Sequence, residues 1–363
     1  MQFKTAFAIL ASMAASVIAQ TNTNTSTIID LLRTQTGQTD QFATLLSGSP
    51  QYQNLITKLS GNGSDANYTV FVPNNAAITK LGAVGQNVDL TNIILYHILN
   101  GSHPASSFSS GINIVSTLLN NGSYDFYSNN IALPLVVSKN DTGLQIPYST
   151  NETANVTQAD LKAMNGIVHI IDSVLSYPIS PSNTIKNLGL NQLYMALNST
   201  NSTGNIDTKK GVTIFAPNDK AFGQFSLANL NASQIQNVIG YHVVDGVYFS
   251  PNLTAFTSPM NLTTQQGKNI TVKNLNGGIE ITDVSGNETA KIVRSDILTN
   301  NGVIHIIDVV LIPSENSTIP NNTSTNFTNT NGKGSAANSL HGAEFSFAAF
   351  LITVAAAVIT IAF

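Results

Sequence analysis

Asn165-Gly-Ile-Val-His-Ile-Ile-Asp-Ser-Val-Leu175 and Asn301-Gly-Val-Ile-His-Ile-Ile-Asp-Val-Val-Leu311 are nearly the same sequence, about 136 residues apart. Both stretches begin with Asn-Gly, which is a turn signal, and continue as runs rich in β-branched residues. We therefore expect each to be the return strand of a hairpin that closes a domain. A repeat of this length is too long for a solenoid unit, so it predicts two self-contained domains.

Two further segments recur in the same order. Tyr68-Thr-Val-Phe-Val-Pro-Asn-Asn-Ala-Ala-Ile78 corresponds to Val212-Thr-Ile-Phe-Ala-Pro-Asn-Asp-Lys-Ala-Phe222. Ile94-Leu-Tyr-His-Ile-Leu-Asn-Gly101 corresponds to Ile239-Gly-Tyr-His-Val-Val-Asp-Gly246. These pairs are about 144 residues apart. The first copy therefore has a longer stretch between its Tyr-His and its final strand, which a surface-loop insertion explains.

The earliest recurring segment has a local structural interpretation. Its β-branched and apolar run ends at Pro73 or Pro217, which cannot donate a hydrogen bond in a ladder. The next residue, Asn74 or Asn218, is suited to cap a helix. The segment therefore predicts a strand, a sharp corner and a short helix.

Helices are expected ahead of the first strand in each copy. Apolar residues recur at mixed spacings of three and four in Ile28 to Leu59 and in Thr184 to Leu197, as they do in amphipathic helices. The fold class is therefore α+β, with helices at the front of each domain and strands behind.

Together these segments resemble the signature of the fasciclin domain family. The longest match is Ala290-Lys-Ile-Val-Arg-Ser-Asp-Ile-Leu-Thr-Asn-Asn-Gly-Val-Ile-His-Ile-Ile-Asp-Val-Val-Leu311, and the resemblance covers about residues 25 to 312. It implies two tandem domains, 20–177 and 178–313, each a wedge-shaped β-sandwich with flanking N-terminal helices. It also implies a role in cell-cell or cell-matrix adhesion on secreted or lipid-anchored proteins.

The resemblance also implies candidate contact residues. In animal members of the family, an Asp-Ile pair before the closing strand and the Tyr-His region are implicated in receptor contact. The corresponding candidates here are Tyr241, His242, Asp296, Ile297, Tyr96 and His97. The first copy departs from the pattern because it has Asp160-Leu161, which weakens the case that it binds in the same way. The chain looks like a fungal cell-surface member of the family, for which animal integrins would not be the partner.

The histidines of the final strands invite a catalytic or metal-binding interpretation. His169 precedes Asp172 by three residues, and His305 precedes Asp308 by the same spacing. On a strand, residues three apart face opposite sides, so each pair should diverge. We favour histidines that are hydrogen-bonded inside the core. For the Tyr-His pairs we also favour a structural role over binding, with the aromatic ring in the core and the imidazole hydrogen-bonded, although the two roles are not exclusive.

Recognised catalytic motifs are missing from the sequence. It contains neither a Gly-x-Ser-x-Gly elbow nor His-Glu-x-x-His nor a phosphate-binding Gly-x-x-x-x-Gly-Lys loop. We therefore expect no enzyme, no metal and no cofactor.

The composition predicts a glycosylated surface. Only 9% of the 363 residues are charged and the net charge is −4, so no basic surface for nucleic acid is expected. With no cysteine, each domain must be stabilised by its own packed interior. About nineteen Asn-x-Ser/Thr sequons predict a coat of N-glycans. The candidate sites are Asn67, Asn100, Asn121, Asn140, Asn151, Asn198, Asn231, Asn252, Asn261, Asn269, Asn287 and Asn316.

The N-terminal segment predicts the compartment. Lys4, an apolar run and small residues up to Ala19 predict a secretory signal peptide over residues 1–19. The alternative of a membrane-spanning anchor would need a longer apolar run with a stop-transfer pattern.

The C-terminal segments predict a lipid anchor. Residues 314–340 are rich in Asn, Thr and Ser and are expected to be an extended glycosylated stalk. Residues 341–363 end in an uncharged apolar run, and the small residues Gly334 and Ser335 precede it as candidate attachment sites. This pattern predicts a glycosylphosphatidylinositol (GPI) signal, with a retained membrane-spanning helix as the alternative. The expected location is the outer leaflet of the plasma membrane or the cell wall.

Three functional hypotheses follow from the sequence. The first is non-enzymatic adhesion to cell-wall polysaccharide or to surface proteins of neighbouring cells, with the membrane held through the lipid anchor and no nucleic-acid partner. The second is a structural wall component or a carrier of a small apolar ligand, which requires a large apolar cavity. The third is a hydrolase, which requires a cleft with convergent catalytic groups.

Overall fold

The structure is a computed structural model that describes residues 26–313, apart from 36, 49, 62–66, 83–89, 121–131, 224, 276–277, 284–285 and 287. The predicted signal peptide 1–19, stalk 314–340 and tail 341–363 lie outside the described residues, and so do Gly334 and Ser335. In the part of the chain that is described, no helix combines the length and the apolar character needed to cross a bilayer.

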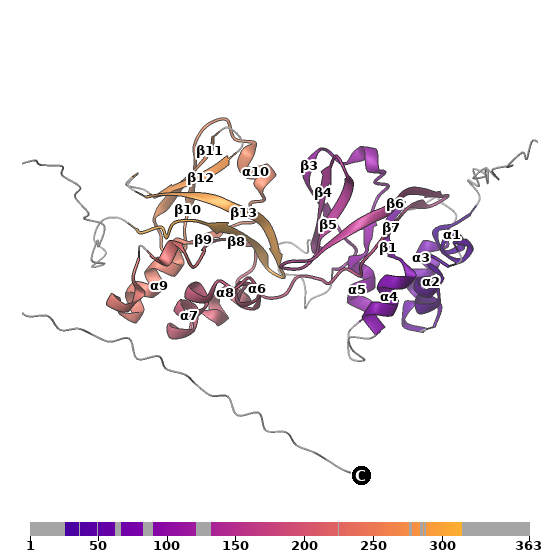
Figure 1. The fold of residues 1–363 in the computed structure, drawn as a ribbon, viewed down its shortest axis with the longest axis horizontal. Coiled ribbons are helices and arrows are strands. Elements are labelled where there is room, and N and C mark those ends of the chain that lie inside the picture. Colours follow the sequence, from indigo (N-terminus) through magenta and orange to yellow (C-terminus); the bar gives the residue numbers. More distant parts are fainter. Residues whose placement is uncertain are drawn as a thin grey trace, which may run out of the picture. The chain divides into compact units, whose positions relative to one another are not determined.

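The first domain, as we use the term, holds the elements from α1 to β7. In chain order they are α1 (Ile28–Thr34), α2 (Asp40–Ser47), η1 (Pro50–Tyr52), α3 (Gln53–Leu59), β1 (Tyr68–Pro73), α4 (Asn75–Gly82), α5 (Leu90–Tyr96), β2 (Ile98–Asn100), η2 (Ala105–Ser107), β3 (Gly111–Ser116), β4 (Pro134–Asn140), β5 (Gly143–Pro147), β6 (Thr153–Ala163) and β7 (Gly166–Ile171). Figure 1 shows α1 to α4 gathered on the side of β1 and β7, with β3 to β5 on the other side.

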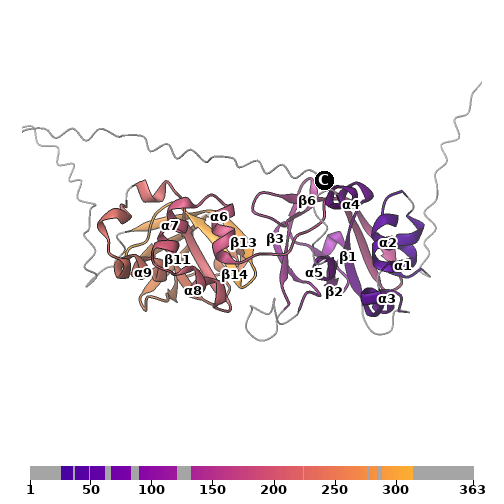
Figure 2. The same ribbon diagram turned by 90° about the horizontal axis from the view of Figure 1, so that it is seen from below.

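The second domain holds the elements from α6 to β14. They are α6 (Pro181–Asn187), α7 (Asn191–Ser199), α8 (Thr203–Thr208), β8 (Val212–Pro217), η3 (Ala221–Gly223), η4 (Leu227–Asn229), α9 (Ala232–Tyr241), β9 (Val243–Asp245), α10 (Ser250–Thr254), β10 (Met260–Thr263), β11 (Asn269–Leu275), β12 (Gly278–Asp283), β13 (Thr289–Thr299) and β14 (Gly302–Ile307). Figure 2 shows α6 and α7 in front of the strands of this domain.

The described residues of each domain form one seven-stranded sheet, and the strand order is the same in both. The order is β2-β1-β7-β6-β5-β4-β3 in the first domain and β9-β8-β14-β13-β12-β11-β10 in the second. The expected hairpins are present, because β6 pairs with β7 and β13 pairs with β14 antiparallel. The sequence did not predict that β7 and β14 are central strands, paired in parallel with β1 and β8.

The sheet of each domain bends back on itself. The long strands β6 and β13 contain register shifts, and such bulges bend a strand. Single bridges, Leu99 with Thr117 and Val244 with Thr264, then bring the two ends of the sheet together. Each domain is therefore a barrel-like β-sandwich with flanking helices, and the predicted fold class is confirmed. The predicted boundaries at 20–177 and 178–313 stay predictions.

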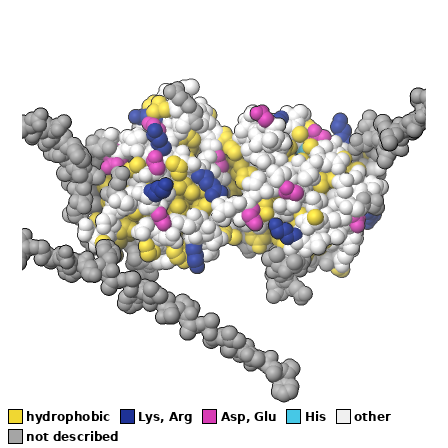
Figure 3. Space-filling view, viewed as in Figure 1, with side chains coloured by type: hydrophobic (Ala, Val, Ile, Leu, Met, Phe, Trp, Pro, Cys, Tyr) yellow, Lys and Arg dark blue, Asp and Glu magenta, His cyan; other side chains and the backbone are white. Residues whose placement is uncertain are grey.

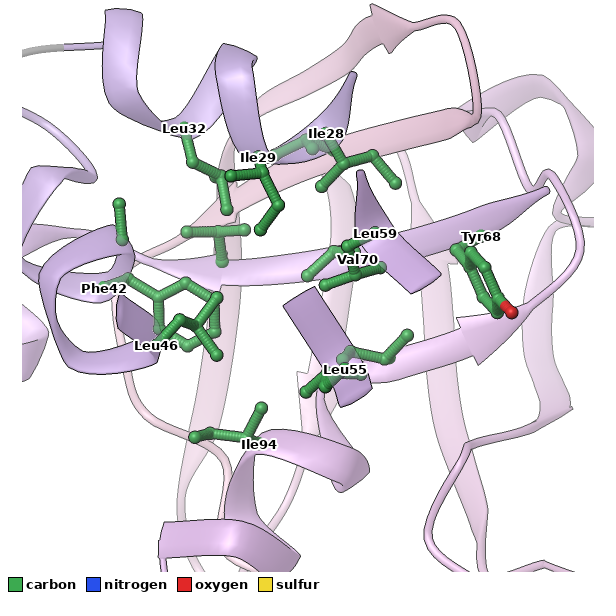
Figure 4. Packing of buried hydrophobic residues seen from close by; sticks show 14 of the residues in the cluster. Ile28, Ile29, Leu32, Phe42, Leu46, Leu55, Leu59, Tyr68, Val70 and Ile94 are labelled. Carbon is green, nitrogen blue, oxygen red and sulfur yellow. The ribbon is translucent and has the colours of Figure 1, made fainter. Parts of the chain in front are cut away.

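The central strands separate two apolar cores. In β1, Val70 and Val72 face the helices and pack with the core cluster that includes Leu32, whereas Phe71 points into the interior of the bent sheet. Figure 4 shows Leu32, Phe42 and Leu46 converging on the helix-facing side of the strand. Because both faces are covered, every residue of β1 is buried, as is expected of a parallel-paired central strand. Strand β8 repeats this arrangement, with Ile214 and Ala216 toward the helices and Phe215 toward the sheet interior.

The predicted corner after the first strand is present in both domains. The side-chain oxygen of Asn74 accepts a hydrogen bond from the Ala77 amide at 2.9 Å, and Asn218 accepts one from the Ala221 amide at 2.9 Å. Asn74 therefore caps α4, and Asn218 caps the shorter η3, as the sequence predicted.

The extra residues of the first copy lie mainly in one connection. Strand β3 ends at Ser116 and β4 begins at Pro134, whereas β10 ends at Thr263 and β11 begins at Asn269. The connection joins two strands at the end of the sheet, away from the central pair. The predicted loop insertion is thereby located.

Candidate functional site

The tyrosines of both Tyr-His pairs are core residues. Tyr96 and Tyr241 are fully buried in the interior of the bent sheets. The Tyr96 hydroxyl donates a hydrogen bond to the Pro134 carbonyl at 3.1 Å, and the Tyr241 hydroxyl donates one to the Asn269 carbonyl at 2.9 Å. A buried phenol normally finds such a partner. Each ring therefore fills the core, and its hydroxyl hydrogen-bonds the end of a helix to a strand.

The adjacent histidine joins the end of a helix to the end of the domain. The Leu175 amide donates to Nε2 of His97 at 2.9 Å, so the proton is on Nδ1, which donates to the Ile93 carbonyl at 2.7 Å. His242 makes the matching contacts with the Leu311 amide at 3.0 Å and the Val238 carbonyl at 2.7 Å. Burial lowers the pKa of both histidines to about 4. Both are therefore neutral near pH 7.

The Asp of the Asp-Ile pair holds an unusual backbone position. Asp296 has φ of 60° and lies within the register shifts of β13, and Asp160 has φ of 61° within those of β6. Aspartate tolerates the left-handed region better than most residues. The carboxylate of Asp296 accepts a hydrogen bond from the Ser250 amide at 2.7 Å and a second from its hydroxyl. The Asp160 carboxylate accepts one from the Ala105 amide at 2.8 Å.

The histidine of the closing strand lies directly beside this bulge. The Asp160 amide donates to Nδ1 of His169 at 3.2 Å, and Nε2 of His169 donates to the His103 carbonyl at 2.9 Å. The ring stacks on Phe71 with 5.3 Å between ring centroids. In the second domain, the Asp296 amide donates to Nδ1 of His305 at 3.3 Å, and Nε2 donates to the Tyr248 carbonyl at 2.8 Å. The ring stacks on Phe215 with 5.7 Å between ring centroids.

Sequence reasoning missed this Asp-His neighbourhood. The available signal was that an Asp precedes a His by nine residues in both hairpins, Asp160 with His169 and Asp296 with His305. The predicted divergence of His169 from Asp172 is confirmed, because Asp172 turns to the amide and side chain of Asn155, each at 2.8 Å.

The six predicted contact residues have little surface to offer a partner. Tyr96, His97 and Tyr241 are fully buried, and His242, Asp296 and Ile297 are at most 8% exposed. In the first copy Leu161 is also buried, whereas Asp160 is exposed. Direct contact through these side chains stays a prediction. The Tyr and His side chains make contacts inside each domain, and Asp296 shapes the backbone at the bulge of β13.

The described sequon asparagines, unlike the predicted contact residues, lie on the surface. All nine candidates that the structure describes are exposed: Asn67, Asn100, Asn140, Asn151, Asn198, Asn231, Asn252, Asn261 and Asn269. The other three, Asn121, Asn287 and Asn316, lie outside the described residues. Figure 3 shows charged side chains scattered over a face that is otherwise mostly uncharged. Glycans could therefore be attached without opening a core.

Two hollows between the helices and the sheet of the second domain are small. They are lined by apolar side chains that include Leu193 and Ile239, together with His242. Each has a volume of about 10 Å³, which is about the space of one water molecule. Among the described residues, no three His, Cys, Asp or Glu side chains are grouped so that they could hold a metal ion.

Replacing Asp296 by alanine should destabilise the second domain by about 1 to 3 kcal/mol, because it removes the acceptor for Ser250 and places a residue less suited to the left-handed conformation. Asp296→Asn should cost less, since asparagine keeps a side-chain acceptor and tolerates this backbone geometry. Urea unfolding of the three proteins measures the difference. If Asp296→Ala were as stable as the wild type, the bulge would not depend on this carboxylate.

Comparisons with known proteins agree with the geometry. The family model described as "Fasciclin domain" matches residues 37–178 and 188–313. A fasciclin-like arabinogalactan protein of Arthroderma benhamiae is 26% identical over 70% of this chain and 60% of its own length. Transforming growth factor-beta-induced protein ig-h3 of Sus scrofa is 24% identical over 74% of this chain and 37% of its own. This chain thus spans less than two thirds of the length of either relative.

A solved structure also matches. It is a FAS1 domain pair from the insect cell adhesion molecule fasciclin I, with 20% sequence identity, a TM-score of 0.37, and coverage of 76% of this chain and 97% of that one.

Proposed function

The chain belongs to the fasciclin domain family, and from this premise we propose that it is a non-enzymatic cell-surface protein that mediates contact between cells or with the cell wall. The observation that carries the proposal is the exposure of all nine candidate glycosylation asparagines that the structure describes, on two domains whose titratable core groups are engaged internally. A surface that can carry glycans, over a core whose polar groups are hydrogen-bonded internally, suits a protein that acts through its surface.

Adhesion by this route would be weak at each contact and strong in sum. Each domain would offer loops and glycans to cell-wall polysaccharide or to surface proteins of neighbouring cells. Many copies on one surface would raise the effective concentration of the second and later contacts, so modest affinities would combine. The similarity to arabinogalactan-type relatives supports a partner or a coat of carbohydrate.

The chain ends complete the proposal. The signal peptide 1–19 would direct the protein outside, and the glycosylated stalk 314–340 would lift the two domains from the surface. A GPI anchor attached at Gly334 or Ser335 would replace the tail 341–363. Phosphatidylinositol-specific phospholipase C should then release the protein from intact cells. Protein that stays with the membrane after this treatment would favour the retained helix instead.

The functional test compares three strains: one lacking the protein, one producing the full chain and one producing a chain cut before residue 341. We expect that only the full chain restores attachment of cells to one another or to isolated wall material, because the cut form would be secreted without display. Equal attachment in all three strains would contradict the proposal.

A structural wall role is the alternative that the same strains can separate. A wall component would leave attachment unchanged in the deletion strain but make the cells more sensitive to wall-degrading enzymes. A carrier of an apolar ligand is less favoured, because the two hollows beneath the helices of the second domain admit about one water molecule each.

A further inference from the structure

His169 and His305 make the same pair of main-chain contacts in two domains of different sequence. Nδ1 of each ring accepts a hydrogen bond from the amide of Asp160 or Asp296, and Nε2 donates to the carbonyl of His103 or Tyr248. One ring nitrogen must therefore be unprotonated in the folded state. This repeated arrangement joins the closing strand to two other segments at once.

Each aspartate links the histidine to a further segment of the chain. Its amide is bound by the histidine and its carboxylate holds the start of a short helical segment, Ala105 in η2 or Ser250 in α10. Its left-handed backbone is costly and persists only where the surroundings impose it. Loss of the histidine contact would therefore act on the bulge and on the segment beyond it.

Protonation removes that contact for a geometric reason. An imidazolium carries a hydrogen on both nitrogens, so Nδ1–H would face the aspartate N–H, donor against donor. We propose that His169 and His305 are acid-operated latches, and that protonation of either imidazole releases the bulge at Asp160 or Asp296 together with the segment that its carboxylate holds.

The groups that face His305 come from three elements. Strand β13 supplies Asp296, whose charge favours the protonated ring, and the segment before α10 supplies Tyr248 through its carbonyl. Strand β8 supplies the uncharged ring of Phe215. Asp308, which follows β14, turns away to the Lys291 amide at 2.6 Å. Burial is the largest influence and lowers the pKa of His305 below its usual value of 6.5.

The first domain offers a variation on the same surroundings. Asp160 of β6 favours the protonated form of His169, whereas the nearby His103 opposes it, and Phe71 of β1 is uncharged. Lys139 of β4 donates to the carbonyls of Ala105 and Phe108, each at 2.9 Å, and adds positive charge to the segment that Asp160 holds. Here too burial is the largest influence and lowers the pKa of His169. Both latches should therefore open in acid below pH 6.5.

Opening would change what the surface presents. Ile297 and Leu161 directly follow the two aspartates and are at most 8% exposed with the latch closed. Release of the bulge would make these side chains accessible. This inference concerns the conformation of each domain and does not depend on the adhesive role proposed above.

Hydrogen exchange of the full secreted chain tests the latch between pH 7 and pH 4.5, after correction for intrinsic exchange rates. Peptides that cover 294–298 and 158–162 should lose protection by about tenfold for each pH unit below the pKa of the latch histidine. Peptides that cover β8 and β1 should keep their protection over the range in which the bulge opens. Equal loss in all peptides would mean global unfolding and would overturn the proposal.

Matched variants identify the responsible residue. His305→Asn keeps an oxygen that can accept from the Asp296 amide but cannot gain a proton, so protection of 294–298 should become independent of pH. In the same protein, residues 158–162 serve as the unaltered control because His169 is intact. The same pH dependence in His305→Asn and in the wild type would overturn the proposal. If the variant fails to fold, the ¹⁵N shifts of the wild-type ring decide: Nδ1 that stays unprotonated until the whole chain unfolds also overturns it.

Discussion

Gly302→Ala should leave the second domain largely unfolded. A Cβ added at Gly302 would lie 2.0 Å from the carbonyl oxygen of Val212, its partner in the parallel pairing of β14 with β8. Real Cβ atoms do not approach a carbonyl oxygen so closely, and the oxygen belongs to the main chain of a central strand, so the two strands would have to separate. We expect a loss of more than about 4 kcal/mol, which is a large part of the stability of a typical domain. Circular dichroism and urea unfolding measure this loss.

The first domain provides a repeat of the experiment, and a nearby glycine provides a control. At Gly166 the added Cβ would lie 1.9 Å from the Tyr68 carbonyl oxygen, so Gly166→Ala should disable the first domain in the same way. Gly204 lies in α8 with no atom near its Cβ position, and Gly204→Ala should be neutral or slightly stabilising. A stable, cooperatively folding Gly302→Ala protein would show that the pairing of β14 with β8 is looser than described here.

These glycines show what the sequence could and could not reveal. The repeated Asn-Gly marked a hairpin turn correctly, since β14 returns from β13. The stronger constraint on Gly302 comes from β8, a strand about 90 residues earlier, and a local pattern carries no record of so distant a partner. The unbroken apolar character of both runs was the available signal, because strands buried on both faces are typical of parallel pairing.

The candidate site was harder to predict than the fold. Alternation along a strand correctly separated His169 from Asp172. The same rule could not place Asp160 beside His169, because the register shifts of β6 break the alternation, and the left-handed residue within them has no sequence signature beyond the aspartate itself. The structural role that the sequence favoured for Tyr241 and His242 agrees with their burial, but the motif could not show which elements cover them. The sequence therefore drew attention to these motifs without showing what surrounds them in the fold.

Acidification from pH 7 to pH 5 should lower the free energy of unfolding of each domain by about 2 kcal/mol through one histidine. The pKa of His97 and of His242 is about 4 in the folded protein because burial disfavours the charged ring, against an ordinary value of 6.5. Between these values the unfolded chain binds a proton that the folded domain does not. Stability therefore falls as the pH drops from 6.5 to 4, and the full loss per histidine is about 3 kcal/mol.

Urea unfolding at intervals from pH 7.5 to pH 4 measures the effect, and His242→Gln isolates its source. This variant should be less stable at pH 7, because the contacts with Val238 and Leu311 are altered, yet its second domain should lose less stability on acidification. The first domain keeps His97 and should retain the original pH dependence, which separates the histidine from the carboxylates that also titrate in acid. Identical slopes in the variant and wild-type second domains would rule His242 out as the cause, since a residue that cannot bind the proton cannot produce the linkage.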